Sequence, residues 1–343
     1  MIVNDFFMAI FFLVVGCEIK KEILYGNLSN IKKAAFPIIA ACGGVIFPAI
    51  IFFLFNSKTP YSLGVGIPIS TDIAFAIGVF MIFKNKLSSS LKIFLLSLAV
   101  VDDLLSILMI ALLYSSDFNY YALGFALIIV GFIVLLNKLG KKDFLTPYLI
   151  LGLILWASLY ISGIHATIAG VILAMMIPTN RKNKNSKVDV TKKVERFFTP
   201  LCNLIILPIF AFSNTGISLD ISFNMASAEN LISGVILGLV IGKPLGIMLF
   251  TYLSTKFHIA EKPKDARWSS IFLVSLIAGI GFTMSIFVTE IAFEGNLQAI
   301  NLAKFSILIA SLLSCTLAYI GIETMPKIVK IYCKKSKKLA LNK

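Results

Sequence analysis

The sequence has few charged residues and few of the residue types that build soluble active sites. Asp, Glu, Lys and Arg together make up 14% of its 343 residues, and hydrophobic residues make up 58%. Soluble domains carry about 25% charged residues. There are two His and five Cys, and no two Cys form a Cys-x-x-Cys pair. This composition excludes a soluble enzyme and favours neither a disulfide framework nor a zinc site, so we expect no cofactor.

Long apolar runs recur along the chain, and the mean hydropathy is +0.94. Runs of about 18 or more apolar residues between short polar stretches are typical of membrane-spanning helices. The first run lacks the basic start and the cleavage motif of a removable signal peptide. We predict an all-α polytopic membrane protein with about eleven transmembrane helices, at residues 3–17, 34–56, 61–83, 93–115, 120–137, 147–163, 164–178, 198–217, 230–253, 269–293 and 299–323.

The net charge of +14 is concentrated in the connections between these helices. Because cytoplasmic loops are enriched in Lys and Arg, every second connection is predicted to be cytoplasmic. This places the C-terminus in the cytoplasm and the N-terminus outside. The charge is therefore a topology signal and gives no reason to expect a nucleic-acid partner. All but three of the 31 Lys and Arg residues lie at 18–33, 84–92, 138–142, 181–196, 256–267 and 327–343.

Two of the predicted helices are interrupted at matching places. Residues 64–72 contain two Gly and one Pro, and residues 279–285 contain two Gly and several hydroxyl side chains. Each interrupted helix is the middle one of a triplet, at 34–115 and at 230–323. Transmembrane helices often tolerate Gly and Pro, but a matched pair predicts inverted repeats with two discontinuous crossing helices, as in secondary transporters.

The same pattern suggests a division of the chain into four parts. Residues 1–178 form a first transmembrane half of seven spans, which includes the first triplet. Residues 179–198 form a basic cytoplasmic linker, and residues 199–323 form a second transmembrane half with the second triplet. Residues 324–343 form a basic cytoplasmic tail.

Three acidic residues, Asp72, Asp102 and Asp103, lie in apolar surroundings. A charged residue in the middle of a transmembrane helix costs roughly 2.5–3.5 kcal/mol, so such residues usually have a function. Adjacent residues of a helix point about 100° apart, so Asp102 and Asp103 can serve different partners around one cavity. A carboxylate pair that only binds a lysine or the backbone is the structural alternative.

Lys243 is a single cation deep within a predicted span, in Gly242-Lys243-Pro244. It requires a counter-ion, and a purely structural salt bridge remains open for this residue. Thr71, beside Asp72, adds a neutral oxygen. Small hard cations prefer oxygen ligands, which carboxylates, hydroxyls and unwound backbone carbonyls can provide.

Several segments closely resemble the NhaA-type sodium/proton antiporters, in unbroken order from about residue 3 to 323. Inverted repeats are a known property of that family, so the broken-helix pattern and the resemblance are not independent. The matching segments include Ser70-Thr71-Asp72, Val101-Asp102-Asp103, Gly242-Lys243-Pro244 and Gly279-Ile280-Gly281, together with residues 11–22, 162–170 and 207–214.

The resemblance implies electrogenic exchange of Na⁺ or Li⁺ for H⁺ by alternating access, contributing to sodium and pH homeostasis. It implies that Asp102 and Asp103 are the pair that carries the cation and the protons, with Asp103 the more indispensable. Asp72 and Thr71 are expected to support this site where the broken helices cross. Lys243 is expected to pair with Asp102 and to take part in proton exchange.

The resemblance also implies pH regulation at a cytoplasmic funnel formed by Glu18, Lys21, Glu22 and Glu195. Lys21 stands where the family has an arginine, which keeps the charge but not the bidentate fork. His165 matches a histidine linked to the pH response, although a lone His after a tight helical hairpin is more often a satisfied polar residue.

The resemblance departs from the family at the start of the chain. The family has one more transmembrane helix and an external hairpin that assists dimerisation, and both are expected to be absent here. A homodimer is therefore expected to be held less firmly. The alternatives left open are a related carrier for another ion or an organic anion, an N-terminally truncated inactive homologue, a retinal protein with a lysine Schiff base, and an intramembrane aspartyl protease.

Overall fold

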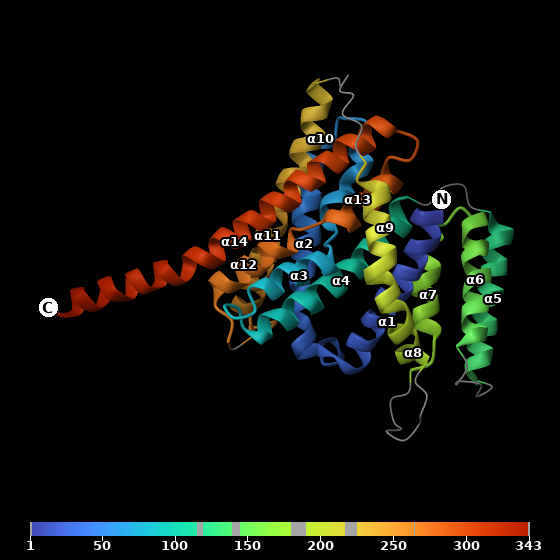
Figure 1. The fold of residues 1–343 in the computed structure, drawn as a ribbon, viewed down its shortest axis with the longest axis horizontal. Helices are drawn as coiled ribbons and strands as arrows, with labels where there is room; N and C mark the ends of the chain where they lie inside the picture. Colours follow the sequence, from blue (N-terminus) through green and yellow to red (C-terminus); the bar gives the residue numbers. More distant parts are fainter. Residues whose placement is uncertain are drawn as a thin grey trace. The chain divides into compact units, whose positions relative to one another are not determined.

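A computed structural model describes residues 2–114, 119–138, 145–179, 190–216, 225–263 and 265–341. Within these residues, helices joined by short turns and loops are the only regular secondary structure (Figure 1). The chain forms two compact units. The first consists of Met1–Ser29 and Asp103–Ser218, and the second of Asn30–Asp102 and Leu219–Lys343.

The second unit combines the two predicted repeats almost entirely. Its elements come from residues 30–102 and from the C-terminal part of the chain, and a buried apolar core that includes Phe80, Leu95 and Ile277 joins them. The elements are α2 (Ile31–Asn56), the 3-10 helix η3 (Ser62–Ile69), α3 (Ile73–Ile82), the first part of α4 (Ser89–Leu113), α10 (Met225–Leu237), the π-helical turn η5 (Gly238–Gly242), α11 (Lys243–Lys256), α12 (Trp268–Ala278), α13 (Phe282–Ala292) and α14 (Leu297–Leu341).

Two helices of this unit approach each other with almost no side-chain volume between them. A Cβ atom on Gly43 of α2 would lie 2.3 Å from the carbonyl oxygen of Gly246 in α11, and a Cβ on Gly246 would lie 2.1 Å from the carbonyl oxygen of Gly43. Small residues at such contacts allow backbones in membranes to pack closely. The contact fixes α11, and with it Lys243 at the first position of that helix, against α2.

The first unit has its own apolar core, which includes Leu13, Tyr148 and Leu173. Figure 1 shows α5 and α6 of this unit running alongside each other, and they are in contact along their length. Its elements are the π-helical turn η1 (Ile2–Phe7), α1 (Met8–Tyr25), the 3-10 helix η2 (Asn27–Ser29), the last part of α4, α5 (Tyr120–Lys138), α6 (Thr146–Ile161), α7 (Ile168–Met176), α8 (Val190–Leu201), the π-helical turn η4 (Cys202–Ile206) and α9 (Leu207–Asn214).

Both predicted helix interruptions are present. Helix α3 begins after a non-helical stretch at residues 70–72, and α12 and α13 are separated at residues 279–281 and bent by 47° relative to each other. Pro68 lies in η3 just before the first interruption. Gly and Pro disfavour continuous helix, which explains why the chain unwinds at these two places.

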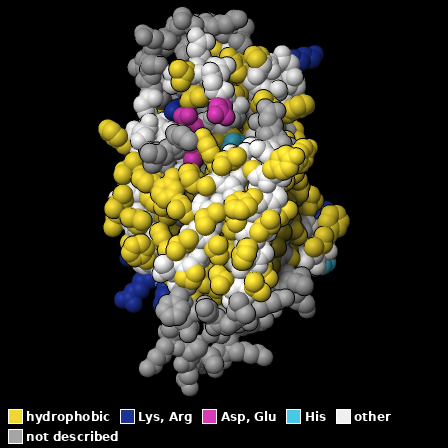
Figure 2. Space-filling view, turned by 90° about the vertical axis from the view of Figure 1, so that its right-hand side faces the viewer, with side chains coloured by type: hydrophobic (Ala, Val, Ile, Leu, Met, Phe, Trp, Pro, Cys, Tyr) yellow, Lys and Arg dark blue, Asp and Glu magenta, His cyan; other side chains and the backbone are white. Residues whose placement is uncertain are grey.

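Within the described residues, seven helical segments are long and apolar enough to cross a membrane, and the bent pair α12–α13 makes up to eight. The predicted spans at 3–17, 147–163 and 164–178 correspond to α1, α6 and α7. These helices are shorter or carry charges, so the full number of eleven crossings stays a prediction. Figure 2 shows hydrophobic side chains covering most of the middle of the face on the side of α5 and α6, as expected for contact with lipid.

The predicted linker and tail are described only in part. Residues 180–189 of the linker lie outside the described residues, and from Val190 onward the chain is already helical in α8. The backbone of the tail continues α14 to Leu341. The compact units do not follow a division at residues 179–198, because each unit takes segments from both predicted halves; the four-part division stays a prediction about the sequence.

Candidate ion-binding site

The central feature of the second unit is a fully buried ion pair. The Nζ atom of Lys243 lies 2.6 Å from Oδ2 of Asp102, and both side chains are 0% exposed. Lys243 also donates a hydrogen bond to the carbonyl oxygen of Ile69, the last residue of η3. That carbonyl is available because η3 ends there and the following residues are not helical. The helix interruption thus supplies a hydrogen-bond acceptor for Lys243.

Thr71 connects the same carboxylate to the second interruption. Its Oγ1 contacts Oδ2 of Asp102 and lies 3.1 Å from the carbonyl oxygen of Ala278, the last residue of α12. A hydroxyl has one proton, so Thr71 donates to only one of these oxygens at a time. Oδ1 of Asp102 is buried and accepts no hydrogen bond from the described residues.

Asp72 joins the two interruptions directly. It is the N-cap of α3, where its Oδ1 accepts the backbone N–H of Phe75 at 3.0 Å. Its Oδ2 accepts the backbone N–H of Thr283 at 3.1 Å and also the Thr283 hydroxyl. In return, the backbone N–H of Asp72 donates to the carbonyl oxygen of Ile280 at 2.8 Å. One carboxylate therefore caps two helix N-termini, where a negative charge is favourable.

Asp103 follows Asp102 in α4 and is 1% exposed. It thus meets the expectation of a second buried carboxylate at the next helix position. Within the described residues, no group of three or more His, Cys, Asp or Glu side chains gathers in a way that could hold a resident metal ion.

Thr283 was not predicted as a site residue, although it lies in the segment 279–285 in which an interruption was predicted. The backbone carbonyl groups of Ile69, Ala278 and Ile280, which accept hydrogen bonds here, were not predicted either. A sequence signal for Thr283 does exist: it is the second residue of a helix that follows an interruption, and such a position has an unsatisfied N–H and requires an acceptor.

The residues expected to regulate the protein by pH lie in the first unit. Lys21 and Glu195 form an ion pair of 3.0 Å, with side chains 55% and 17% exposed. Glu18 lies just past the predicted span at 3–17. Burial raises the pKa of Glu18, the negative charge of Glu195 raises it further, and the positive charge of Lys21 lowers it. The three side chains therefore form one electrostatically connected group.

The other two regulatory candidates have local structural roles. Oε1 of Glu22 accepts hydrogen bonds from the backbone N–H of Asn27 at 2.8 Å and from Nδ2 of Asn27 at 3.2 Å, just after the end of α1. Nε2 of His165 lies 3.0 Å from the carbonyl oxygen of Tyr114, near the end of α4. His165 is thus a hydrogen-bonded polar residue in the turn between α6 and α7.

Comparison with known families gives a match along most of the chain. The model of the family described as Na⁺/H⁺ antiporter 1 matches residues 1–322. The chain belongs to this family. It is a multi-pass membrane antiporter that exchanges Na⁺ for H⁺, and a carrier for another ion or an organic anion is not favoured.

Relatives of this antiporter occur in several bacteria. It is 44% identical to the Na(+)/H(+) antiporter NhaA 2 of Flavobacterium johnsoniae, over 95% of this chain and 79% of the relative. It is 43% identical to the NhaA antiporter of Helicobacter acinonychis, over 91% of this chain and 80% of the relative. It is 45% identical to NhaA 2 of Aliarcobacter butzleri, over 89% of this chain and 78% of the relative.

Proposed function

We propose that Asp102 and Asp103 carry Na⁺ or H⁺ alternately through the antiporter. The observation that supports this most directly is the Asp102 carboxylate: it is fully buried, Lys243 and Thr71 contact its Oδ2, and its Oδ1 accepts no hydrogen bond from the described residues. A buried carboxylate oxygen of this kind is a good ligand for a small hard cation. Asp103, at the next helix position, supplies the second carboxylate.

Lys243 makes the binding of Na⁺ and H⁺ mutually exclusive at Asp102. The ammonium occupies Oδ2, so a Na⁺ ion that binds this carboxylate must compete with a cation already in contact with it. Loss of a proton from Lys243 removes that competitor, and return of the proton expels the metal ion. A proton on a carboxylate likewise blocks an oxygen that Na⁺ requires. Coupling then needs no step beyond competition for the same oxygens.

Asp72 and Thr71 hold the two interruptions together around this pair. Thr71 links the Asp102 carboxylate to the end of α12, and Asp72 caps both α3 and α13. The dipoles of these helix N-termini, left without Asp72, would repel a cation. Asp72 therefore offsets their positive ends and supports the site without needing to be a ligand itself.

The exchange of two protons for one Na⁺ or Li⁺ moves one net charge per cycle. A membrane potential then contributes about 2.3 kcal/mol per 100 mV, equivalent to about a fiftyfold sodium gradient. The antiporter would use this energy to export sodium and to adjust the cytoplasmic pH. It would do so with its C-terminus in the cytoplasm and its N-terminus outside, and it would assemble as a homodimer.

Glu18, Lys21 and Glu195 are the proposed pH sensor, and Glu22 and His165 are secondary candidates. The sensor is supported by the electrostatic connection between the three side chains, since a change in the protonation of Glu18 changes the charge that faces Glu195 and Lys21. Glu22 and His165 are supported less well, because each is already hydrogen-bonded to a local partner.

The test is a transport assay in everted membrane vesicles, in which the pH gradient is followed after addition of Na⁺. The wild type is expected to collapse the gradient, and Asp103→Asn is expected to give no Na⁺-dependent response. Asp265→Asn is the matched control, because Asp265 lies in an exposed connection, where it accepts a long hydrogen bond of 3.4 Å from the Ser90 hydroxyl. Equal responses of the wild type and Asp103→Asn would reject the assignment of the site.

A further inference from the structure

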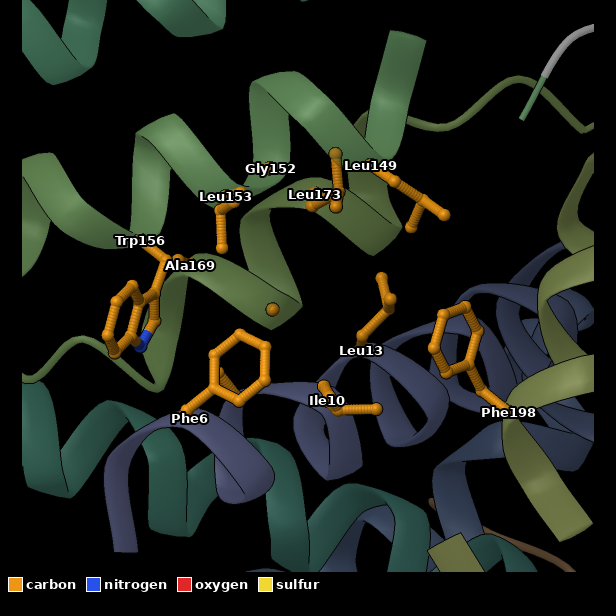
Figure 3. Close-up of a pocket in the computed structure, with 12 residues that line it drawn as sticks. Phe6, Ile10, Leu13, Leu149, Gly152, Leu153, Trp156, Ala169, Leu173 and Phe198 are labelled. Carbon is orange, nitrogen blue, oxygen red and sulfur yellow. The ribbon is translucent and has the colours of Figure 1, made fainter. Parts of the chain in front are cut away.

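The first unit contains an apolar cavity of about 250 Å³ that takes no part in the ion site (Figure 3). Four helices form its walls, and Figure 3 shows Phe6 and Trp156 at one end and Leu149 and Phe198 at the other. The cavity follows the end of η1 and the start of α1, from Phe6 to Leu13, over about 10 Å. Its lining residues are Phe6, Ala9, Ile10, Leu13, Leu149, Gly152, Leu153, Trp156, Ala169, Gly170, Leu173 and Phe198.

The size and lining of the cavity favour an apolar occupant. A cavity of roughly 150 Å³ lined by Leu, Ile and Phe stays free of water and binds benzene, so a larger cavity with a similar lining has room for a longer hydrocarbon. Several wall residues are well buried, among them Leu13, Ala169 and Leu173 at 4%, 2% and 4% exposed. Atoms that line a void lose packing contacts, and an occupant restores them.

The cavity has one polar group that lacks an acceptor. Nε1 of Trp156 is buried and makes no hydrogen bond with the described residues. Its ring neighbours are Phe6, edge-on at 5.5 Å, and Tyr160, stacked at 6.1 Å. In Figure 3 the nitrogen lies on the side of the indole that faces Phe6, at one end of the cavity. A buried indole N–H usually has a hydrogen-bond partner, so an occupant with an acceptor at that end is favoured.

The cavity is accessible from the surface that contacts the membrane. Leu153, one of its lining residues, is 53% exposed, and Ile150 of the same helix is 56% exposed. Both residues belong to α6, and Figure 2 shows hydrophobic side chains over much of the face on the side of α5 and α6. In a protein that spans a membrane, the molecules next to such a face are lipids, whose tails are as apolar as leucine.

We propose that this cavity binds one acyl chain of a membrane glycerophospholipid, and that the ester carbonyl of that chain accepts the hydrogen bond of Trp156 Nε1–H. The tail lies between α1, α6, α7 and α8, and the ester group lies at the end formed by Phe6 and Trp156. The bound acyl chain fills the cavity of the first unit and has no contact with a transported ion.

The first test measures lipids retained by the purified antiporter with native mass spectrometry. The wild type is expected to retain one phospholipid after delipidation. Ala169→Leu, which adds volume inside the cavity, is expected to lower the retained fraction about tenfold. Ala157→Leu makes the same change on α6 at a residue that does not line the cavity, and it is expected to retain lipid as the wild type does. Trp156→Phe removes the N–H together with the five-membered ring of the indole, and it is expected to lower retention roughly two- to tenfold.

The second test uses the fluorescence of Trp156, and the sequence makes it simple because there are only two Trp residues. Trp268→Phe leaves Trp156 as the single indole. In vesicles of phosphatidylcholine brominated on its acyl chains, its fluorescence is expected to be strongly quenched. Adding Ala169→Leu is expected to halve the quenching, and adding Ala157→Leu is expected to leave it unchanged.

Three results would overturn the proposal. The first is a wild type that retains no lipid, and the second is a retained fraction that Ala169→Leu does not change. The third is a change in the proportion of monomer and dimer in Ala169→Leu at unchanged lipid content, which would assign the cavity to a second copy of the chain. The variants remain informative if transport is lost, because both readouts report binding.

Discussion

The two units place their ion pairs in opposite environments. In the second unit, Lys243 and Asp102 are 0% exposed and lie 2.6 Å apart. In the first, Lys21 and Glu195 lie 3.0 Å apart and are 55% and 17% exposed. The contacts are of similar length, but only the Lys21–Glu195 pair of the first unit is open to water.

This difference separates two kinds of task. A charge in the buried pair has no water to replace a lost partner, so removal of one member changes what the other can bind. An exposed pair is screened by salt and solvent and contributes little to stability. We therefore expect the buried pair to suit the proposed transport role and the exposed pair to suit the proposed regulatory role.

The largest expected effect comes from breaking the buried pair. Lys243→Met should lower the free energy of unfolding by about 3–5 kcal/mol, because it leaves the Asp102 carboxylate buried without its cation. The double variant Lys243→Met with Asp102→Asn should recover most of this stability and none of the transport. Chemical unfolding in detergent, combined with the vesicle assay, measures both. If the two single effects simply add in the double variant, the pair does not act as one unit.

An intermediate effect is expected at the contact between the two interruptions. Thr283→Val removes the hydroxyl that donates to Asp72 and keeps the shape of the side chain, so unfolding should become easier by about 1–3 kcal/mol. Thr289→Val is the matched control on α13, since the Thr289 hydroxyl donates only to the Ser285 carbonyl of its own helix, at 2.8 Å. Thermal unfolding compares the two variants. A loss in Thr289→Val as large as in Thr283→Val would show that Asp72 is not the reason.

The smallest effect is expected in the group formed by Glu18, Lys21 and Glu195. The pKa of Glu18 is raised above its usual value of 4.5, so the folded protein keeps a proton that the unfolded chain has lost. Its contribution to stability is therefore present below about pH 4.5 and is lost as the pH rises through the higher pKa of the folded state. Glu18→Gln should make the stability of the protein depend less on pH above that value. Lys21→Met should move the loss to higher pH, because it removes the charge that lowers the pKa of Glu18.

The change caused by Lys21→Met should stay below about 1 kcal/mol and shrink at high salt. Unfolding series between pH 4 and pH 8, at low and high ionic strength, measure it. A stability curve that Glu18→Gln leaves unaltered would remove Glu18 from the group.

Much of the fold could be predicted because hydropathy and helix breakers act locally. The apolar run at 120–137 corresponds to α5, and the Gly and Pro residues at 64–72 predict the interruption before α3. The regrouping of residues 30–102 with the C-terminal part of the chain could not be derived, because packing between distant segments leaves no local signal. The helix that begins at Val190 was missed because its first turns are basic and amphipathic rather than apolar.

The candidate site shows the same contrast between local sequence signals, which can be predicted, and packing between distant segments, which cannot. A buried Lys243 required a counter-ion, and the family resemblance implied that this would be Asp102; the structure places the two in contact. The sequence could not indicate that the carbonyl group of Ile69 shares this lysine, because every residue has a carbonyl and only the three-dimensional path of the chain selects one. The roles of Asp102, Asp103 and the proposed pH sensor in transport stay predictions.

The closely packed glycines of α2 and α11 carry a consequence for the transport cycle. Because Gly43 and Gly246 bring backbone against backbone, neither helix can rotate about its own axis without collision. Lys243 starts α11, three residues before Gly246, so its ammonium travels wherever α2 travels. Any rearrangement that opens the ion site to one side of the membrane must therefore move both helices together as one rigid pair. An alanine at either position would force the two helices apart and prevent this joint movement.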